Sequence, residues 1–297
     1  MTSLHDRIQE FCAARWGWET LPAGLFEEVW LPLATQIAAW RQETAGVLIQ
    51  GILGGQGTGK TTLATILIEI LREWGLTVGQ LSLDDLYKTY ADRQQLQRAD
   101  PRFRWRGPPG THDVALGLAV LRQLKQGVFP IELPRFDKSA WNGMGDRTHP
   151  EVIAHADILL FEGWFVGVRP IDPGQFEQAP APIERESDRI FAREMNDRLQ
   201  DYLPLWENLD RLIVLHPQDY RWSKPWRREA EQRMMAAGRS GMTDEEIDEF
   251  VEYFWRSLHP ELLIQPLLSD PDHVDLVIEI DTHHQPQRVY QPTQKIN

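Results

Sequence analysis

A glycine-rich segment at positions 54–61 holds the residues in this sequence that are best suited to chemistry. It fits the pattern G-x-x-x-x-G-K-[ST] in full. Glycines let the backbone wrap so that its N–H groups point at phosphate oxygens, and the start of a following helix adds positive potential. The pattern therefore predicts a loop that binds Mg-ATP, and a glycine-rich turn with an incidental lysine is the alternative. The expected nucleotide-binding residues are Gly54, Gly55, Gln56, Gly57, Thr58, Gly59, Lys60, Thr61 and Thr62.

Two of these residues have further expected roles. In such loops the lysine, here Lys60, reaches the β- and γ-phosphates, and the hydroxyl of Thr61 ligates Mg²⁺. A dinucleotide-binding fingerprint fits worse, because the segment ends in Lys-Thr.

Two carboxylates stand at the ends of short apolar runs. Asp84 follows the run at 78–83, and Glu162 follows the run at 158–161. Ligands of open α/β sheets bind outside the carboxyl ends of the strands. Asp84 is therefore a candidate for the base that accepts the proton of an attacking hydroxyl, and Glu162 is a candidate ligand of Mg²⁺ or of its water. The alternative for both is a helix cap or a surface acid.

Two groups of cations stand out in an acidic chain. One group is a candidate lid whose arginines stabilise the transferred charge. The alternative is a solvated helix face paired with Glu229 and Glu231. Its members are Arg221, Lys224, Arg227, Arg228, Arg233 and Arg239.

The second group lies in loops rich in glycine and proline. Arg106, Lys138 and Arg147 could hold an anionic acceptor, and His112 could orient its hydroxyl. The alternatives are ordinary ion pairs and a structural histidine. No function is assigned to the pair at 283–284.

The elements that must position these residues alternate along the chain. Five apolar runs of strand length occur at 47–53, 78–83, 158–161, 212–215 and 276–280. The segment after the glycine-rich loop has apolar residues at helix spacing and ends at Gly75. Strands that alternate with helices predict an α/β fold, a P-loop NTPase-type parallel sheet flanked by helices. We expect a helical N-terminal extension at 1–45 and a kinase domain at 46–297, with a helical lid at about 217–260.

The composition of the chain limits the kinds of partner that the protein is expected to bind. The chain has 297 residues and a formal net charge of -13, so it repels nucleic acid and anionic lipid, and neither is expected as a partner. Cys12 is the only cysteine, which excludes an intrachain disulfide. No apolar run reaches the ~18 residues that a membrane span needs. These features predict a cytoplasmic protein with a small-molecule substrate, and they leave the oligomeric state open.

With these motifs in place, the sequence resembles the D-glycerate 3-kinase family of the plant and cyanobacterial photorespiratory type. That family is grouped with phosphoribulokinase, uridine kinase and pantothenate kinase. The resemblance covers about residues 47–265. The stretches that carry it are GGQGTGKTT, SLDDLYKTY, RGPPGTHD, LPRFDKSAWNGMGDR, ADILLFEGWFVG, MNDRLQDYLPLW, WRREAE and GMTDEEIDEFVEYF.

The resemblance implies roles at matching positions. It implies that Asp84 is the catalytic aspartate, that Glu162 is the acid after the third strand, and that Trp226 and Arg227 form the lid pair. A departure is the spacer at 223–225, which leaves open whether Arg221 or Arg227 is the working arginine. The implied reaction converts ATP and D-glycerate to ADP and 3-phosphoglycerate.

Three alternatives stay open at this point. The same chemistry could act on uridine, pantothenate or a sugar phosphate. The chain could be a nucleotide-driven switch, although it lacks an [NT]-K-x-D guanine motif. It could also bind nucleotide without catalysis.

Overall fold

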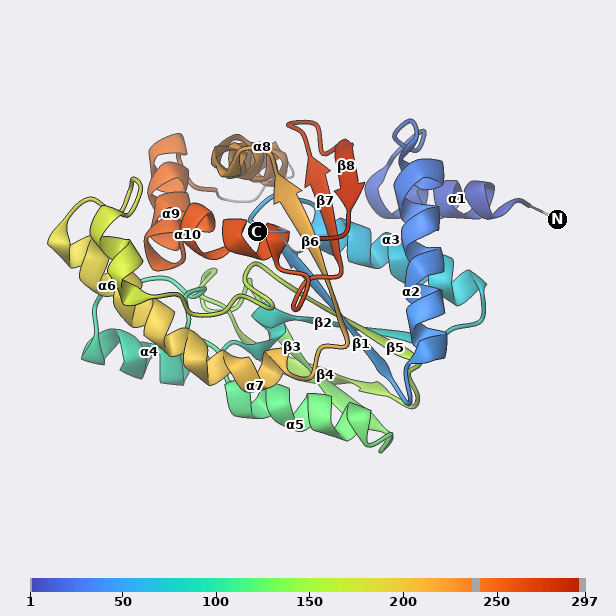
Figure 1. Cartoon of the computed structure of the whole chain (residues 1–297), viewed down its shortest axis with the longest axis horizontal. Coiled ribbons are helices and arrows are strands. Elements are labelled where there is room, and N and C mark those ends of the chain that lie inside the picture. Colours follow the sequence, from blue (N-terminus) through green and yellow to red (C-terminus); the bar gives the residue numbers. More distant parts are fainter. Residues whose placement is uncertain (1, 237–240, 294–297) are drawn as a thin grey trace.

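A six-stranded sheet forms the centre of the molecule (Figure 1). The computed structural model describes residues 2–236 and 241–293. The strand order is β2-β5-β1-β6-β7-β8, and the first five strands run parallel, with β8 antiparallel at one edge. The strands are β1 (Leu48–Gly54), β2 (Val78–Ser82), β5 (Ile158–Gly163), β6 (Arg211–Pro217), β7 (Leu276–Ile280) and β8 (Pro286–Tyr290). All five predicted strands are confirmed, and so is the mostly parallel α/β fold.

The sheet separates two apolar cores. Along β1, Leu48 and Ile52 pack into one core, whereas Ile49 and Leu53 pack into the other. This alternation follows from the two-residue period of a strand, and every residue of β1 is buried because both faces are covered. Because both faces of such a strand are buried, its sequence is a continuous apolar run and does not alternate between apolar and polar residues.

Helices cover both faces of the sheet (Figure 1). Residues of α1, η1, α2 and α3 share a core with one face, and residues of α5, α6 and α7 share a core with the other. Helices of the first face are α1 (Leu4–Trp16), the π-helical η1 (Phe26–Trp30), α2 (Leu31–Glu43) and α3 (Lys60–Glu73). Those of the second are α5 (Val114–Lys125), α6 (Glu186–Arg198), the 3₁₀ turn η4 (Leu199–Tyr202) and α7 (Leu203–Trp206). The segment 1–45 is thus packed on α3. The division of the chain into an N-terminal extension and a kinase domain stays a prediction.

A small antiparallel hairpin stands apart from the main sheet. Strand β3 (Ile131–Asp137) pairs with β4 (Asp146–Ile153). Arg147 was expected in a loop, and the structure corrects this, because the residue lies in β4. Most of β4 is exposed and carries polar residues, so it lacks the apolar run that marked the other strands.

The remaining helical segments include those of the predicted lid. The predicted lid contains η5 (Tyr220–Trp222), α8 (Ser223–Ala236) and α9 (Asp244–Ser257). The other elements are η2 (Leu83–Leu86), α4 (Tyr90–Ala99), η3 (Pro173–Gln178), α10 (Pro260–Leu263) and η6 (Gln265–Ser269). Across residues 2–236 and 241–293, every helix is too short or too polar to cross a lipid bilayer.

Candidate active site

The glycine-rich loop connects β1 to α3, as its sequence pattern predicts. Gly57 and Gly59 have φ angles of +78° and +85°, which side-chain-bearing residues rarely adopt. A Cβ atom at Gly57 would also lie 2.7 Å from the Cβ atom of Trp226. Lys60 is the first residue of α3, so the positive end of the helix faces the loop. The segment therefore has the geometry of an anion-binding loop.

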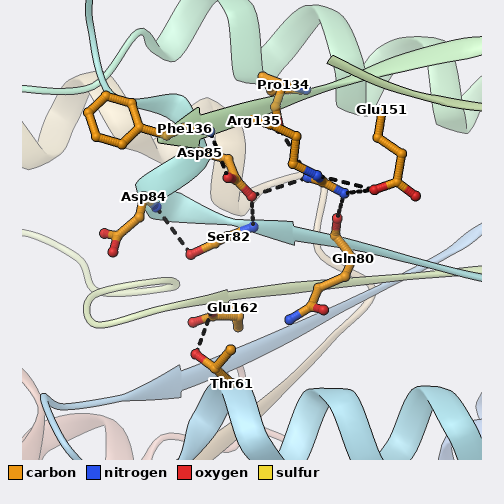
Figure 2. A network of polar contacts seen from close by, with 10 residues as sticks. All are labelled: Thr61, Gln80, Ser82, Asp84, Asp85, Pro134, Arg135, Phe136, Glu151 and Glu162. Carbon is orange, nitrogen blue, oxygen red and sulfur yellow. Dashed lines mark hydrogen bonds and ion pairs between the residues drawn. The ribbon is translucent and has the colours of Figure 1, made fainter. Parts of the chain in front are cut away.

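Thr61 meets Glu162 at the carboxyl end of β5. Strand β5 lies beside β1, with Leu53 in register with Gly163. The Thr61 hydroxyl donates to Oε1 of Glu162 at 3.0 Å (Figure 2). Glu162 is only 2% exposed, and its Oε2 atom is buried without a hydrogen-bond partner among the described residues. A buried carboxylate oxygen without a partner is costly, so this position favours a cation.

Asp84 follows β2, the strand on the other side of β5. The turn η2 begins with a reciprocal cap, because the Ser82 hydroxyl accepts from Asp84 N and the Asp85 carboxylate accepts from Ser82 N. Lys138 Nζ lies 2.6 Å from Oδ2 of Asp84. Burial alone would raise the pKa of Asp84, but the charges of Lys138 and Lys60 and a hydrogen bond with Tyr87 lower it to about 2. Asp84 is therefore a firmly ionised carboxylate.

An arginine of β3 attaches the hairpin to this turn (Figure 2). Arg135 Nη1 lies 3.2 Å from Asp85 Oδ2, and its Nη2 donates to the Gln80 carbonyl at 2.9 Å and to Glu151 at 2.6 Å. The backbone N–H of Phe136 also donates to the Asp85 carboxylate. Lys138 follows two residues later on the same segment, so this network determines where its ammonium group lies.

These groups line one cavity. Its volume is about 490 Å³, and its wall includes the side chains of Thr61, Asp84, Lys138 and Glu162. No group of three or more His, Cys, Asp and Glu side chains within residues 2–236 and 241–293 is arranged to hold a metal. A metal at Glu162 would therefore need the Thr61 hydroxyl, phosphate oxygens or water as its other ligands.

Arg106 and Arg147 already have partners within the chain. Arg106 Nη1 donates to the carbonyls of Gly143 and Met144 at 2.8 and 3.0 Å. Arg147 pairs with Asp113 at 2.8 Å and also donates to a backbone carbonyl. Of the predicted acceptor residues, the structure brings Lys138 into contact with Asp84, whereas these two arginines hold the surrounding loops.

His112 is a buried neutral side chain, 2% exposed. Burial lowers its pKa to about 3. The Tyr202 hydroxyl accepts from the backbone N–H of Gly110 at 2.9 Å and lies 2.8 Å from Nδ1 of His112. Nε2 of the same imidazole is buried and has no partner in the described part of the chain.

Sequence reasoning missed two further groups next to Asp84. The ring of Tyr87 stacks on His112 with centroids 4.5 Å apart, and Tyr87 also forms the hydrogen bond that lowers the pKa of Asp84. The second group that was missed is the ion pair between Asp85 and Arg135. Neither has a motif of its own, although Tyr87 and Asp85 both lie within the stretch that drew attention to Asp84.

The predicted lid cations are largely engaged in ion pairs. Arg227 pairs with Glu231 at 2.9 Å, and Arg228 pairs with Asp248 of α9 at 2.6 Å. Lys224 contacts Glu252 of α9 at 2.8 Å, and the exposed Arg221 lies near Asp219 and Glu261. Arg239 and the side chain of Arg233 lie outside the described residues. Trp226, next to Arg227, packs directly on the glycine-rich loop.

The chain is similar to several kinases. It is 33% identical over 255 residues to the chloroplastic D-glycerate 3-kinase of Arabidopsis thaliana, covering 80% of this chain and 54% of that protein. The chain thus spans about half the length of that relative. It is also 33% identical to the kinase mug58 of Schizosaccharomyces pombe, covering 69% of this chain and 78% of that protein.

Structural similarity extends further along the chain. The solved structure of a D-glycerate 3-kinase from Cryptococcus neoformans superposes with a TM-score of 0.79 at 26% identity. It covers 91% of this chain and 100% of that one. No model of a known protein family matches the sequence.

Proposed function

We propose that this chain, which belongs to the D-glycerate 3-kinase family of P-loop kinases, transfers the γ-phosphoryl group of ATP to a hydroxyl of D-glycerate. The observation that carries the proposal is the meeting of three groups around one cavity. Thr61 with Glu162 is the first group, Asp84 is the second and Lys138 is the third, and all of them line the same space. A phosphate-binding loop, a metal ligand, a hydroxyl-directed carboxylate and a cation are the parts that this transfer needs.

ATP and Mg²⁺ fit the loop and the acid beside it. P-loop kinases use ATP with a divalent metal. We assign residues 54–62 to the phosphates, and we assign Thr61 and Glu162 to Mg²⁺. The unpartnered, buried Oε2 atom of Glu162 supports this assignment. When bound, Mg²⁺ neutralises charge on the β- and γ-phosphates.

Asp84 acts on the acceptor hydroxyl. A carboxylate whose pKa is about 2 is a weak base, so its first contribution is to orient the hydroxyl by accepting its hydrogen bond. As the acceptor oxygen forms its bond to the γ-phosphorus, the bond from that phosphorus to the β–γ bridging oxygen breaks and ADP leaves, while the hydroxyl proton moves to Asp84. Lys60 stabilises the charge of the transferred group.

Lys138 is the residue we assign to the acceptor carboxylate. Its side chain is 60% exposed and reaches into the cavity, so its ammonium group can turn from Asp84 to a bound anion. Such an exchange would remove the strongest positive charge next to Asp84 and raise the pKa of that carboxylate, which makes it a better base. We assign Arg106, Arg147 and His112 a supporting role around the acceptor site, because the two arginines hold neighbouring segments and none of the three is among the residues that line the cavity.

Arg227 is the lid residue that we assign to the transition state. Arg227 lies within α8, and the neighbouring Trp226 packs against the glycine-rich loop. This turn of the helix is therefore close to the loop that we assign to the phosphates. For the arginine to reach a phosphoryl oxygen, its contact with Glu231 must be exchanged for that oxygen.

The test is an acceptor screen. The protein is incubated with Mg-ATP and, separately, D-glycerate, L-glycerate, pantothenate, uridine or ribulose 5-phosphate. Phosphorus NMR identifies the product, and the Lys60→Ala variant measures background hydrolysis. We expect 3-phosphoglycerate from D-glycerate. Efficient turnover of another acceptor with D-glycerate inert would overturn the substrate assignment, and no ADP release with any acceptor would overturn the kinase assignment.

A further inference from the structure

A histidine near the C-terminus touches the glycine-rich loop. His284 Nε2 lies 2.6 Å from the carbonyl oxygen of Gly57, although 227 positions separate the two residues. A carbonyl only accepts, so the imidazole is the donor. Gly57 is at the apex of the loop that we assign to the phosphates, and a direct contact there bears on nucleotide binding.

The turn between β7 and β8 is built to present this side chain. Asp281 Oδ1 accepts from the backbone N–H groups of His283 and Gln285 at 2.8 and 2.9 Å, and its Oδ2 accepts from Gln287 at 3.0 Å. His284 itself has a φ of +61°, in the left-handed region that residues with side chains rarely occupy. Unfavourable backbone angles of this kind concentrate at functional positions, which directs attention to the contact that His284 makes.

Trp226 holds the imidazole from its other side. The two rings stack with centroids 4.4 Å apart and an interplanar angle of 28°. Trp226 Nε1 donates to the Thr282 carbonyl in the same turn at 2.9 Å, and the Cβ atom of Trp226 lies against Gly57. The lid helix, the turn and the loop are thus joined at one point.

The contact determines which way one peptide of the loop faces. The carbonyl of Gly57 and the N–H of Thr58 belong to the same trans peptide and point in opposite directions. His284 holds the carbonyl, so the Thr58 N–H is directed to the inside of the loop. There it makes only a long contact of 3.4 Å with the Gly55 carbonyl. This N–H is therefore available to a phosphate oxygen.

We infer that His284 is a positioning residue for nucleotide binding, which acts by fixing the peptide between Gly57 and Thr58. The inference rests on the proposed function in one respect, that this loop binds the phosphates of ATP. The inferred role of His284 concerns nucleotide binding alone and does not involve the binding of the acceptor. The loss of His284 should therefore weaken nucleotide binding and leave the acceptor KM unchanged.

The experiment compares three variants of the full chain. Isothermal titration calorimetry with Mg-ADP gives the dissociation constant, and steady-state kinetics give KM separately for ATP and for D-glycerate. A hydrogen bond of ordinary strength corresponds to a change of about 3- to 10-fold, which is the rise we expect in the Kd for ADP and the KM for ATP of His284→Ala. In His284→Gln the amide N–H can replace the Nε2 donor, so binding should return to within about twofold of wild type.

The matched control is His283→Ala. His283 is exposed on the same turn and uses its backbone N–H to contact Asp281, so this variant should bind ADP as wild type does. Wild-type affinity in His284→Ala would overturn the inference. So would weak binding in His284→Gln, or an equal rise in the KM for ATP and for D-glycerate. If wild-type protein fails to bind Mg-ADP, the proposed function fails instead.

Discussion

Acidification should destabilise the fold through His112. In the folded chain this imidazole is 2% exposed, and burial lowers its pKa to about 3, whereas its ordinary value is 6.5. Between these two pH values the unfolded chain binds a proton that the folded chain does not bind. The free energy of unfolding must therefore fall as the pH is lowered from 6.5 toward 3.

The magnitude follows from the two pKa values. One proton of difference corresponds to about 1.4 kcal/mol for each pH unit, so the 1.5 units between pH 6.5 and pH 5 cost about 2 kcal/mol. His259 is fully buried, and burial lowers its pKa to about 4, so it adds a loss of similar size over the same range. The contribution of His112 has to be isolated with a variant.

The assay is urea unfolding at pH 7 and pH 5 for wild type and His112→Asn. Asparagine keeps a polar amide near the Tyr202 hydroxyl, where it can donate or accept, and removes the titration. The wild-type protein should lose about 2 kcal/mol more than the variant between the two pH values. The control His149→Asn changes an exposed histidine and should behave as wild type. An equal loss in wild type and His112→Asn would refute the reasoning, because His112 would then titrate no differently in the two states.

Four further predictions concern catalysis. Lys60→Ala should lower ADP release by about 10²–10³-fold without changing the thermal unfolding midpoint, and near wild-type turnover would contradict its role. Asp84→Asn should lower kcat by about 10²–10⁴-fold with ADP binding retained, as measured by calorimetry; an unchanged kcat would mean that this aspartate serves only as a cap. Glu162→Gln should raise the Mg²⁺ concentration needed for half-maximal activity by about 10- to 100-fold, and an unchanged Mg²⁺ titration would remove it from the metal site. Arg227→Ala should lower kcat far more than it weakens ADP binding; if Arg221→Ala does so instead, the spacer has moved the working arginine.

The parts of the fold that could be predicted from the sequence are those with local signals. The five parallel strands appeared as apolar runs because both faces of each strand are covered. The glycine-rich loop appeared because its function requires fixed residue types at fixed spacing. The hairpin of β3 and β4 was missed, since an exposed strand that contains His149 and Pro150 has no apolar period.

The contacts of the site depend on distant pairs, which no periodicity reveals. Lys138 was expected to hold an anionic acceptor, but its 2.6 Å contact with Asp84 depends on how Arg135 anchors the hairpin. Arg106 was expected at the acceptor, and the structure shows its guanidinium on backbone carbonyls of the neighbouring loop. The contact of His284 with the glycine-rich loop had no signal at all, because it depends on the path of the C-terminal hairpin.

The contact between Arg135 and the Gln80 carbonyl also bears on self-association. Strand β2 is the outermost strand on its side of the sheet, and the backbone groups along such an edge can pair with a strand from another molecule. Arg135 occupies one of these carbonyls with a charged group from the hairpin, which obstructs that pairing. We therefore expect that the arginine that places Lys138 at the cavity also hinders edge-to-edge association along β2.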